Sequence, residues 1–267
     1  MNILERVPRD AKLRSLITQA TFGKRIFCPR CGSSHVNRSE HRYRCPRCRK
    51  PFSLTSASWL KGMKLDLEKL WLLVDCWQRR IAFKTASEIA GVSTITVRRW
   101  FRRFQEHLVY ESPDLEGIVE MDEAFLGRKR HGNQRIVLGA YERTSKKIVV
   151  RMTKSREQGT TDEFLLRHVD TSSMIWTDGA MCYEGIDEFF GYLHGSCNHG
   201  NWEFGPTNHI ENVWSALKGF IRRTYHHFHK EWLPMLLREF EARWNTPDLF
   251  LSPLFYLRTC LLAVPSR

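Results

Sequence analysis

Four cysteines near the start of the chain constrain its fold more than any other feature. Cys28, Cys31, Cys45 and Cys48 form two Cys-x-x-Cys pairs with 13 residues between them. Each pair directs two thiolates at one point, and two such turns complete a tetrahedral Zn²⁺ shell with no open position. A segment this small buries too little apolar surface to fold alone, so the metal would stabilise it. The spacing predicts a zinc ribbon with one structural Zn²⁺, against the alternatives of coincidental buried cysteines or a redox pair.

The chain is basic, and its charge is unevenly placed. Of its 267 residues, 42 are Lys or Arg and 29 are Asp or Glu, which gives a formal charge of +13. Residues 1–112 carry 23 basic and 9 acidic side chains, whereas residues 113–267 carry 19 and 20. A basic front half is typical of a region that binds a polyanion. We therefore predict that the zinc ribbon, residues 1–60, lies against DNA phosphates, with Arg47 and Lys50 among its contacts.

Composition excludes several classes of protein. A hydrophobic fraction of 42% with nine Trp and sixteen Phe is too high for a disordered chain. No apolar run approaches the roughly 20 residues that span a bilayer. The opening stretch, MNILERVPRDAKLR, has no apolar centre and is not a secretory signal. We expect a cytoplasmic, nucleoid-associated protein with no membrane partner.

A helical region follows the ribbon, and its pattern predicts a helix-turn-helix domain over residues 61–112. From Asp66 onward, apolar residues recur at spacings of three and four, which predicts an amphipathic helix. Thr85 and Glu88 form a predicted capping box for a second, short helix. Gly91 is expected to end that helix in the left-handed conformation, and Ser93 to open the next one.

The third of these helices has the properties of a recognition helix. Its predicted inward face carries Val97, Trp100, Phe101, Phe104 and Leu108. The outward face carries four arginines, which can reach phosphates and base edges: Arg98, Arg99, Arg102 and Arg103. The alternative is a solvated basic helix in an ordinary helical bundle.

The remainder, residues 113–267, alternates strands and helices. Strands are predicted at 117–127, 135–143, 147–154, 173–179 and 192–199. Helices are predicted at 162–169, 181–191, 208–227 and 230–244, with an apolar tail beyond. Three meandering strands followed by alternating helices and strands are the order of an α/β, ribonuclease H-like sheet with flanking helices. The predicted architecture is therefore such a domain, preceded by a zinc ribbon and a helix-turn-helix domain.

One acid lies inside the first of these strands. Isolated carboxylates among apolar strand residues are costly unless they are paired or bind a metal. Because side chains alternate along a strand, Asp122 shares a face with Glu120 and Ala124, while Glu123 points away. Asp122 is therefore a candidate metal ligand.

Further candidates follow on a strand end and on the long helix. Asp178 precedes Gly179 at a strand end, where a carboxylate can enter a cleft. The helix offers Glu211, with Asn208 one turn earlier and Lys218 two turns later on the same side. Two or three oxygen ligands, completed by water and phosphate, are what pairs of Mg²⁺ ions use in phosphoryl transfer. Lys218 would hold a DNA phosphate as a point charge.

Ordinary structural roles are alternatives for these residues. Asp178 and Gly179 could form a turn only. Asn208 and Glu211 could be an N-cap with its reciprocal acid. Trp214 and Leu217 on the same helix are expected to be core residues.

At these residues the chain resembles bacterial insertion-sequence transposases of the group related to the eukaryotic Merlin elements. The resemblance is carried, behind the zinc ribbon, by four motifs: VEMDEAFLGRK, MIWTDGAMCYEG, LHGSCNHG and TNHIENVWSALKGFIRRTYHHF. It implies a ribonuclease H-like catalytic core with an acidic triad and two divalent ions, Mg²⁺ or Mn²⁺. The implied reaction is cleavage of DNA at the element ends, followed by attack of the freed 3′-OH on target DNA.

The resemblance also implies roles for single residues. By position, Asp122 and Asp178 match the first two acids, and Glu211 matches the third, with Asn208 as the alternative third ligand. Lys218 matches a basic residue that follows, and His199 matches a position near the active site. The implied partners are double-stranded DNA (terminal inverted repeats and target) and further copies of the chain in a homodimer or higher oligomer.

Other functions remain open at this point. The chain could be a zinc-ribbon and helix-turn-helix DNA-binding regulator with an inactive ribonuclease H-like domain. It could be a structure-selective nuclease of the same fold, or an inactive domesticated relative.

Overall fold

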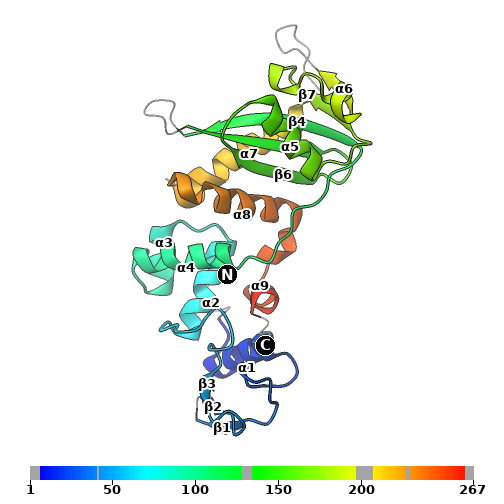
Figure 1. Cartoon of the computed structure of the whole chain (residues 1–267). Helices are drawn as coiled ribbons and strands as arrows, with labels where there is room; N and C mark the ends of the chain where they lie inside the picture. Colours follow the sequence, from blue (N-terminus) through cyan, green and yellow to red (C-terminus); the bar gives the residue numbers. More distant parts are fainter. Residues whose placement is uncertain (1–6, 41, 128–133, 197–206, 227–228, 262–267) are drawn as a thin grey trace. The chain divides into compact units, whose positions relative to one another are not determined.

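The computed structural model describes residues 7–40, 42–127, 134–196, 207–226 and 229–261. The chain forms two compact units, which are treated separately below (Figure 1). The first unit comprises Met1–Val109 together with Asp248–Arg267, and the second comprises Tyr110–Pro247. The predicted third domain, 113–267, differs from this division at its end, because the segment from Asp248 onward packs in the first unit. An apolar tail pattern does not specify which core the tail fills.

The first unit begins with a helix and a small sheet. Helix α1 (Asp10–Phe22) precedes three antiparallel strands in the order β1-β2-β3: β1 (Asn37–Ser39), β2 (Arg42–Arg44) and β3 (Pro51–Ser53). Phe22 and Phe52 are buried together with Cys28 and Cys45. The ring of Tyr43 stacks on that of Phe52, its partner across the sheet, with centroids 5.4 Å apart. Strands β1 and β2 lie between the two cysteine pairs in the chain, and β3 follows the second pair.

Four helices complete the first unit: α2 (Leu67–Gln78), α3 (Phe83–Ala90), α4 (Thr94–Glu106) and α9 (Pro253–Cys260). Gly91 ends α3 in the left-handed conformation, with φ of 58°, and the Ser93 hydroxyl caps α4 by accepting from the Thr96 N–H. Both features were predicted. The capping box at Thr85 is wrong, because α3 begins two residues earlier and Thr85 lies inside it. The expected apolar faces of α2 and α4 are buried.

Helix α9 supplies part of the core of the first unit. The buried ring of Tyr256 lies against Trp77 of α2 and Phe104 of α4, with centroids 5.1 and 5.9 Å apart. Its hydroxyl donates a hydrogen bond to the Phe104 carbonyl at 2.9 Å. A 3₁₀ turn, η7 (Pro247–Phe250), precedes this helix.

The second unit is built on a five-stranded sheet of order β6-β5-β4-β7-β8. Its strands are β4 (Ile118–Leu126), β5 (Arg135–Glu142), β6 (Ile148–Thr153), β7 (Met174–Thr177) and β8 (Leu193–Ser196). The first three form an antiparallel meander, whereas β7 runs parallel to β4 and β8 parallel to β7. This is the ribonuclease H-like arrangement predicted from the order of elements.

Helices cover both faces of this sheet (Figure 1). On one face α5 (Gln158–His168), η3 (Met181–Tyr183) and α6 (Ile186–Phe190) enclose the apolar core. On the other face α7 (Asn208–Phe220) crosses β4 and β5, and α8 (Leu233–Asn245) packs along β6. The short turns η5 (Ile221–Tyr225, π-helical) and η6 (Lys230–Trp232) lie between α7 and α8.

Two predicted helices differ from the structure in their extent. The helix predicted at 181–191 is divided in two, because Gly185 takes a left-handed conformation with φ of 75°. The helix predicted at 208–227 is α-helical only to Phe220 and continues as the π-helical turn. Within the residues described, no helix combines the length and the apolar character needed to cross a membrane.

Candidate active site

The register of two parallel strands brings Asp122 and Asp178 together. Glu120 on β4 is paired with Trp176 on β7. Asp122 is two residues further along β4, and Asp178 directly follows Thr177, the last residue of β7, so both acids lie near the same end of these paired strands. The pKa of Asp122 is raised to about 6, chiefly by burial, and the negative charge of Asp178 is among the smaller causes. The two acids therefore lie near enough for their charges to interact.

Asp122 is held by a residue from α7. The indole N–H of Trp214 donates a hydrogen bond to Oδ2 of Asp122 at 2.8 Å, and this contact lowers the pKa against the effect of burial. Trp214 and Leu217 are both buried, as predicted for core residues. Trp214 therefore combines packing with a contact to the first acid, which sequence reasoning did not anticipate.

Asp178 follows the last residue of β7 in a side-chain turn. Its Oδ1 accepts a hydrogen bond from the Ala180 N–H at 3.0 Å, and Gly179 has φ of 75°. The alternative of a turn at this position is thus present. It does not compete with a role in a site, because the turn holds the carboxylate at the strand end beside Asp122.

The start of α7 is capped from β4. The backbone N–H groups of His209 and Ile210 both donate to Oε2 of Glu120, at 2.9 and 3.1 Å. The alternative in which Asn208 caps the helix with Glu211 as reciprocal acid is therefore wrong: the N-cap position is Thr207. Asn208 and Glu211 are exposed on the first turn of the helix.

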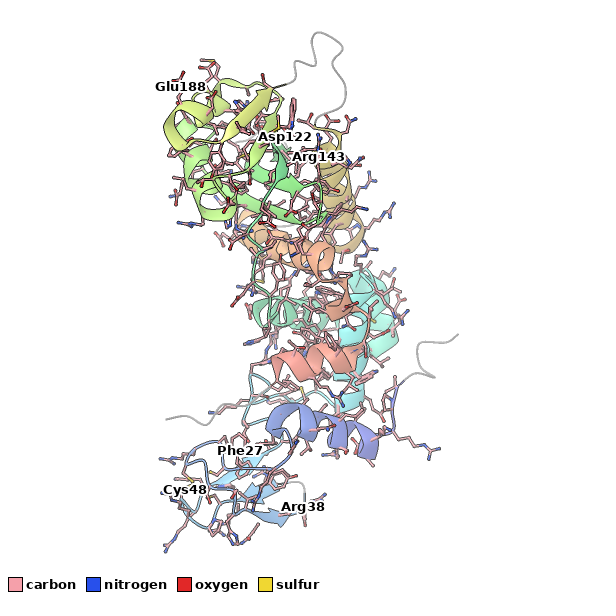
Figure 2. The ribbon with its side chains drawn as sticks, turned by 90° about the vertical axis from the view of Figure 1, so that its right-hand side faces the viewer. Phe27, Arg38, Cys48, Asp122, Arg143 and Glu188 are labelled. Carbon is pink, nitrogen blue, oxygen red and sulfur yellow. The ribbon has the colours of Figure 1, made fainter. Side chains whose placement is uncertain are left out.

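Glu120 is a buried acid whose contacts sequence reasoning did not predict. Its side chain is fully buried, with Oε1 accepting from Arg143 at 2.8 Å and bonded to the His209 ring at 2.7 Å. The His209 ring stacks on Tyr141, with centroids 5.1 Å apart. The sequence did carry a signal for this role: Glu120 is an acid on the same face as Asp122 in an apolar strand, and a buried charge needs partners. Figure 2 labels Asp122, on β4, and Arg143, which directly follows β5.

Glu123 lies on the opposite face, as predicted. Its side chain is only 4% exposed, forms an ion pair with Arg156 and accepts a hydrogen bond from the Tyr183 hydroxyl at 2.8 Å. Through Tyr183, Glu123 therefore helps to attach η3 to β4 on that face of the sheet.

The donor set fits a hard divalent cation, because two carboxylates held beside each other repel until a cation joins them. In the described part of the chain, however, the acids form no group of three with ligand atoms all within 4.8 Å. Glu211 therefore does not close around Asp122 and Asp178 as tightly as one ion would require. Lys218 is exposed on α7, and His199 lies outside the described residues.

The four cysteines do form such a closed group. Their sulfur atoms all lie within 4.8 Å of one another, and the Cys28–Cys48 and Cys31–Cys45 pairs are each 3.6 Å apart. A tetrahedron of Zn–S bonds of about 2.3 Å has sulfur atoms about 3.8 Å apart. The pKa of Cys45 is lowered to about 7, first by a hydrogen bond from the Cys48 backbone N–H. The predicted cysteine cluster therefore fits Zn²⁺.

The four arginines of α4 are not equivalent. Arg98, Arg99 and Arg102 are exposed, and Arg102 pairs with Glu106 at 3.0 Å. Arg103 instead lies over the rings of Trp59 and Trp100, 5.2 and 4.7 Å from their centroids, and donates to the Trp59 carbonyl. Arg103 thus serves the packing of the first unit, which differs from its predicted place on the outward face.

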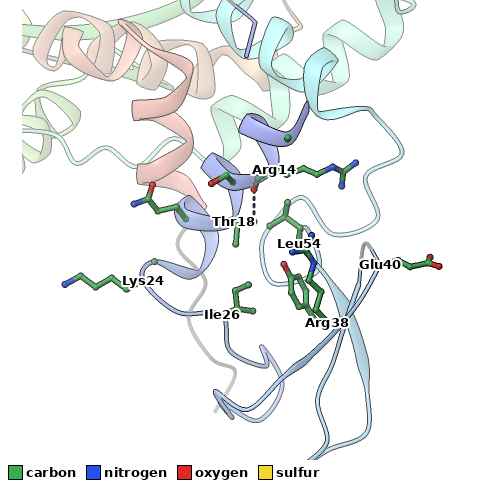
Figure 3. Close-up of a pocket in the computed structure, with 12 residues that line it drawn as sticks. Arg14, Thr18, Lys24, Ile26, Arg38, Glu40 and Leu54 are labelled. Carbon is green, nitrogen blue, oxygen red and sulfur yellow. Dashed lines mark hydrogen bonds between the residues drawn. The ribbon is translucent and has the colours of Figure 1, made fainter. Parts of the chain in front are cut away.

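A cavity of about 540 Å³ lies between α1 and the small sheet (Figure 3). Its lining includes three cationic residues, Arg14, Lys24 and Arg38, and one acid, Glu40. Sequence reasoning did not single out this cavity. Arg47 and Lys50, which it did single out, are exposed and do not line it.

The amino-acid sequence of the chain is similar to those of proteins from mobile elements. Residues 114–245 match the family of ISXO2-like transposase domains. The chain is 23% identical over 266 residues to an uncharacterized protein in transposable element ISH50 of Halobacterium salinarum, with 88% of this chain and 90% of that protein covered.

Two solved structures show more distant similarity. The catalytic core domain of BIV integrase has a TM-score of 0.37 and 14% identity, covering 49% of this chain and 84% of that chain. The HTLV-2 integrase catalytic core domain in complex with magnesium has a TM-score of 0.35 and 10% identity, covering 50% and 87%. The ribonuclease H-like fold is assigned from the strand order of the second unit, and the transposase domain from the match over residues 114–245.

Proposed function

We propose, from the premise that residues 114–245 form an ISXO2-like DDE transposase domain, that this protein is the transposase of an insertion sequence. It binds the terminal inverted repeats, cleaves DNA at the element ends and joins the 3′-OH ends to target DNA. The observation that supports this proposal is the proximity of Asp122 and Asp178, which lie near the same end of the parallel strands β4 and β7 and whose charges interact.

The residues of this site have distinct roles in the proposed reaction. Asp122 and Asp178 hold the divalent ions, and α7 supplies the third ligand, Glu211 or alternatively Asn208. When bound, two Mg²⁺ or Mn²⁺ ions activate the attacking oxygen and stabilise the leaving 3′ oxygen. Lys218, two helical turns after Glu211, holds a phosphate of the DNA strand.

Binding of duplex DNA is assigned to the first unit. Helix α4 presents Arg98, Arg99 and Arg102 to the major groove. The zinc ribbon, with Arg47 and Lys50, contacts the phosphate backbone. Because two element ends are joined to one target, we propose a homodimer or larger assembly on DNA, acting in the cytoplasm at the nucleoid.

The decisive experiment is incubation of the full-length protein and Mg²⁺ with a duplex that carries the inverted repeat flanking its gene. Mapping of the products should show nicks at the element end and, with target DNA present, joined 3′ ends. Asp122→Asn and Asp178→Asn should bind the duplex and leave it uncut. Retained cleavage by Asp122→Asn would refute the assignment.

The third ligand is tested in the same assay. Glu211→Gln and Asn208→Ala differ in which candidate they remove from the first turn of α7. The variant that loses cleavage in Mg²⁺ identifies the ligand. Cleavage retained in both single variants and in the double variant would show that α7 supplies no ligand.

One observation favours a second candidate function, a DNA-binding regulator with an inactive ribonuclease H-like domain. Glu211 does not close around the two aspartates within the described residues. A regulator would bind the inverted repeat and leave it intact at every Mg²⁺ or Mn²⁺ concentration, including in the presence of target DNA.

A further inference from the structure

We propose that Trp214 is a positioning residue for Asp122, fixing the orientation in which this carboxylate meets a divalent ion. The inference rests on the proposed function, because it assigns Asp122 to the metal site. Its basis is the geometry of three elements, β4, β5 and α7, at one point on the sheet.

The first observation is the contact itself. The indole N–H of Trp214 lies 2.8 Å from Oδ2 of Asp122, and the Trp214 side chain is 5% exposed. A buried indole has a single donor and a fixed plane, so the hydrogen bond selects one orientation of the carboxylate.

The second observation is the space that admits the indole. Gly139 on β5 is the residue paired with Asp122 across the strands. A Cβ at Gly139 would lie 2.3 Å from Cη2 and 2.7 Å from Cζ2 of Trp214. Only a residue without a side chain lets the ring lie against the strand at this position, so the backbone of β5 locates the ring that orients the acid.

The third observation is the charge of the partner. Strand β4 carries three acids close together, and two of them have cationic partners: Glu120 pairs with Arg143, and Glu123 pairs with Arg156. Asp122 instead accepts hydrogen bonds from uncharged N–H groups, those of the Trp214 indole and the Glu123 backbone. A cationic partner would compete with a metal ion for the carboxylate, whereas an indole orients it and leaves its charge in place. Removal of such supporting contacts typically weakens metal binding by about 10- to 100-fold.

The test measures binding of Mn²⁺ alone to the full-length protein. Binding is detected as a loss of the free-ion signal in electron paramagnetic resonance. A chelator-treated, zinc-reconstituted protein is used, so that the cysteine site stays filled. Trp214→Phe removes the N–H and keeps an aromatic ring. Gly139→Ala keeps the indole and displaces it. Trp244→Phe is the matched control, because Trp244 donates the same kind of bond, at 2.8 Å, to the Lys146 carbonyl in the same unit.

We expect Trp214→Phe to weaken Mn²⁺ binding at least tenfold, Gly139→Ala to change it in the same direction, and Trp244→Phe to leave it within twofold of the unmodified protein. Melting temperatures measured in parallel separate this effect from loss of folding. Should Trp214→Phe be unfolded, the result with Gly139→Ala decides the question.

Asp122→Asn distinguishes failure of this inference from failure of the proposed function. Weak Mn²⁺ binding by Asp122→Asn together with unchanged binding by folded Trp214→Phe and Gly139→Ala would overturn the role of Trp214 and leave the metal site standing. Unchanged binding by Asp122→Asn, or no binding by the unmodified protein, would overturn both.

Discussion

Truncation of Glu120 should release the first turn of α7 from the sheet. In the folded protein this buried carboxylate accepts hydrogen bonds from the backbone N–H groups of His209 and Ile210 and from the Arg143 side chain. Glu120→Ala removes all of these acceptors at once. The prediction is a large loss of stability together with a loss of order at the helix that carries the candidate third ligand.

The magnitude follows from what each partner loses. A buried donor left without an acceptor costs about 1–3 kcal/mol, which applies in full to the Ile210 N–H, whereas the part-buried His209 N–H loses less. The Arg143 side chain is 31% exposed, so it regains water and contributes less. Together these losses are expected to reach about 2–5 kcal/mol, which overlaps the range of about 3–5 kcal/mol found when one partner of a buried ion pair is removed. Glu120→Gln, which keeps the volume and one acceptor oxygen, should cost about half as much.

Urea unfolding of the full-length protein measures this loss as a lower midpoint at an unchanged slope. Hydrogen exchange assigns it, since amides near the start of α7 should exchange faster than those of β4. Glu116→Ala, an exposed acid just before the same strand, is the control and should change stability by no more than about 0.5 kcal/mol. If Glu120→Ala unfolds within 1 kcal/mol of this control, the carboxylate does not anchor α7 and the reasoning is refuted.

Three further predictions concern Asp122, the cysteine cluster and α4. Burial raises the pKa of Asp122 to about 6, so its stabilising contribution is complete below its ordinary pKa and is lost as pH rises through 6. Without divalent ions, Asp122→Asn should therefore raise the free energy of unfolding at pH 8 by at most about 3 kcal/mol, seen as a higher melting temperature. At pH 4 it should produce no such increase. Cys28→Ser should lower the zinc content, measured by atomic absorption, below one ion per chain and weaken duplex binding, with unaltered binding counting against a structural zinc ribbon. Arg99→Ala should reduce the slope of log affinity against log salt by about 1, whereas Arg103→Ala should lower the melting temperature instead, because Arg103 packs between two tryptophans.

Local patterns were sufficient to place the strands of the second unit. Alternation of side chains put Asp122 on the face of Glu120, and the parallel pairing of β4 with β7 then aligned it with Asp178. Helix signals that act over a few residues, such as Gly91 and Ser93, were also correctly interpreted. Each of these features depends on neighbours in the chain or on the repeat of a strand.

Features that depend on distant partners were not predictable. Glu120 is 89 residues from His209, and Arg103 is 44 residues from Trp59, so no local spacing links them. The capping alternative for Asn208 was wrong for the same reason, because the acceptor for the first N–H groups of α7 is Glu120 on β4. Pairing of the two aspartates required only strand order, whereas the place of Glu211 depends on how a helix sits over the sheet.

The return of the chain to the first unit has a consequence for synthesis. Helix α9 contributes the Tyr256 ring to a core whose other members, Trp77 and Phe104, leave the ribosome more than a hundred residues earlier. The helical core of the first unit therefore lacks the Tyr256 ring until the second unit, Tyr110–Pro247, has been translated. A nascent chain thus acquires its finished α2–α4 core only after Asp122 and Asp178 have been translated. Products that terminate before α9 would lack the Tyr256 ring and with it part of this core.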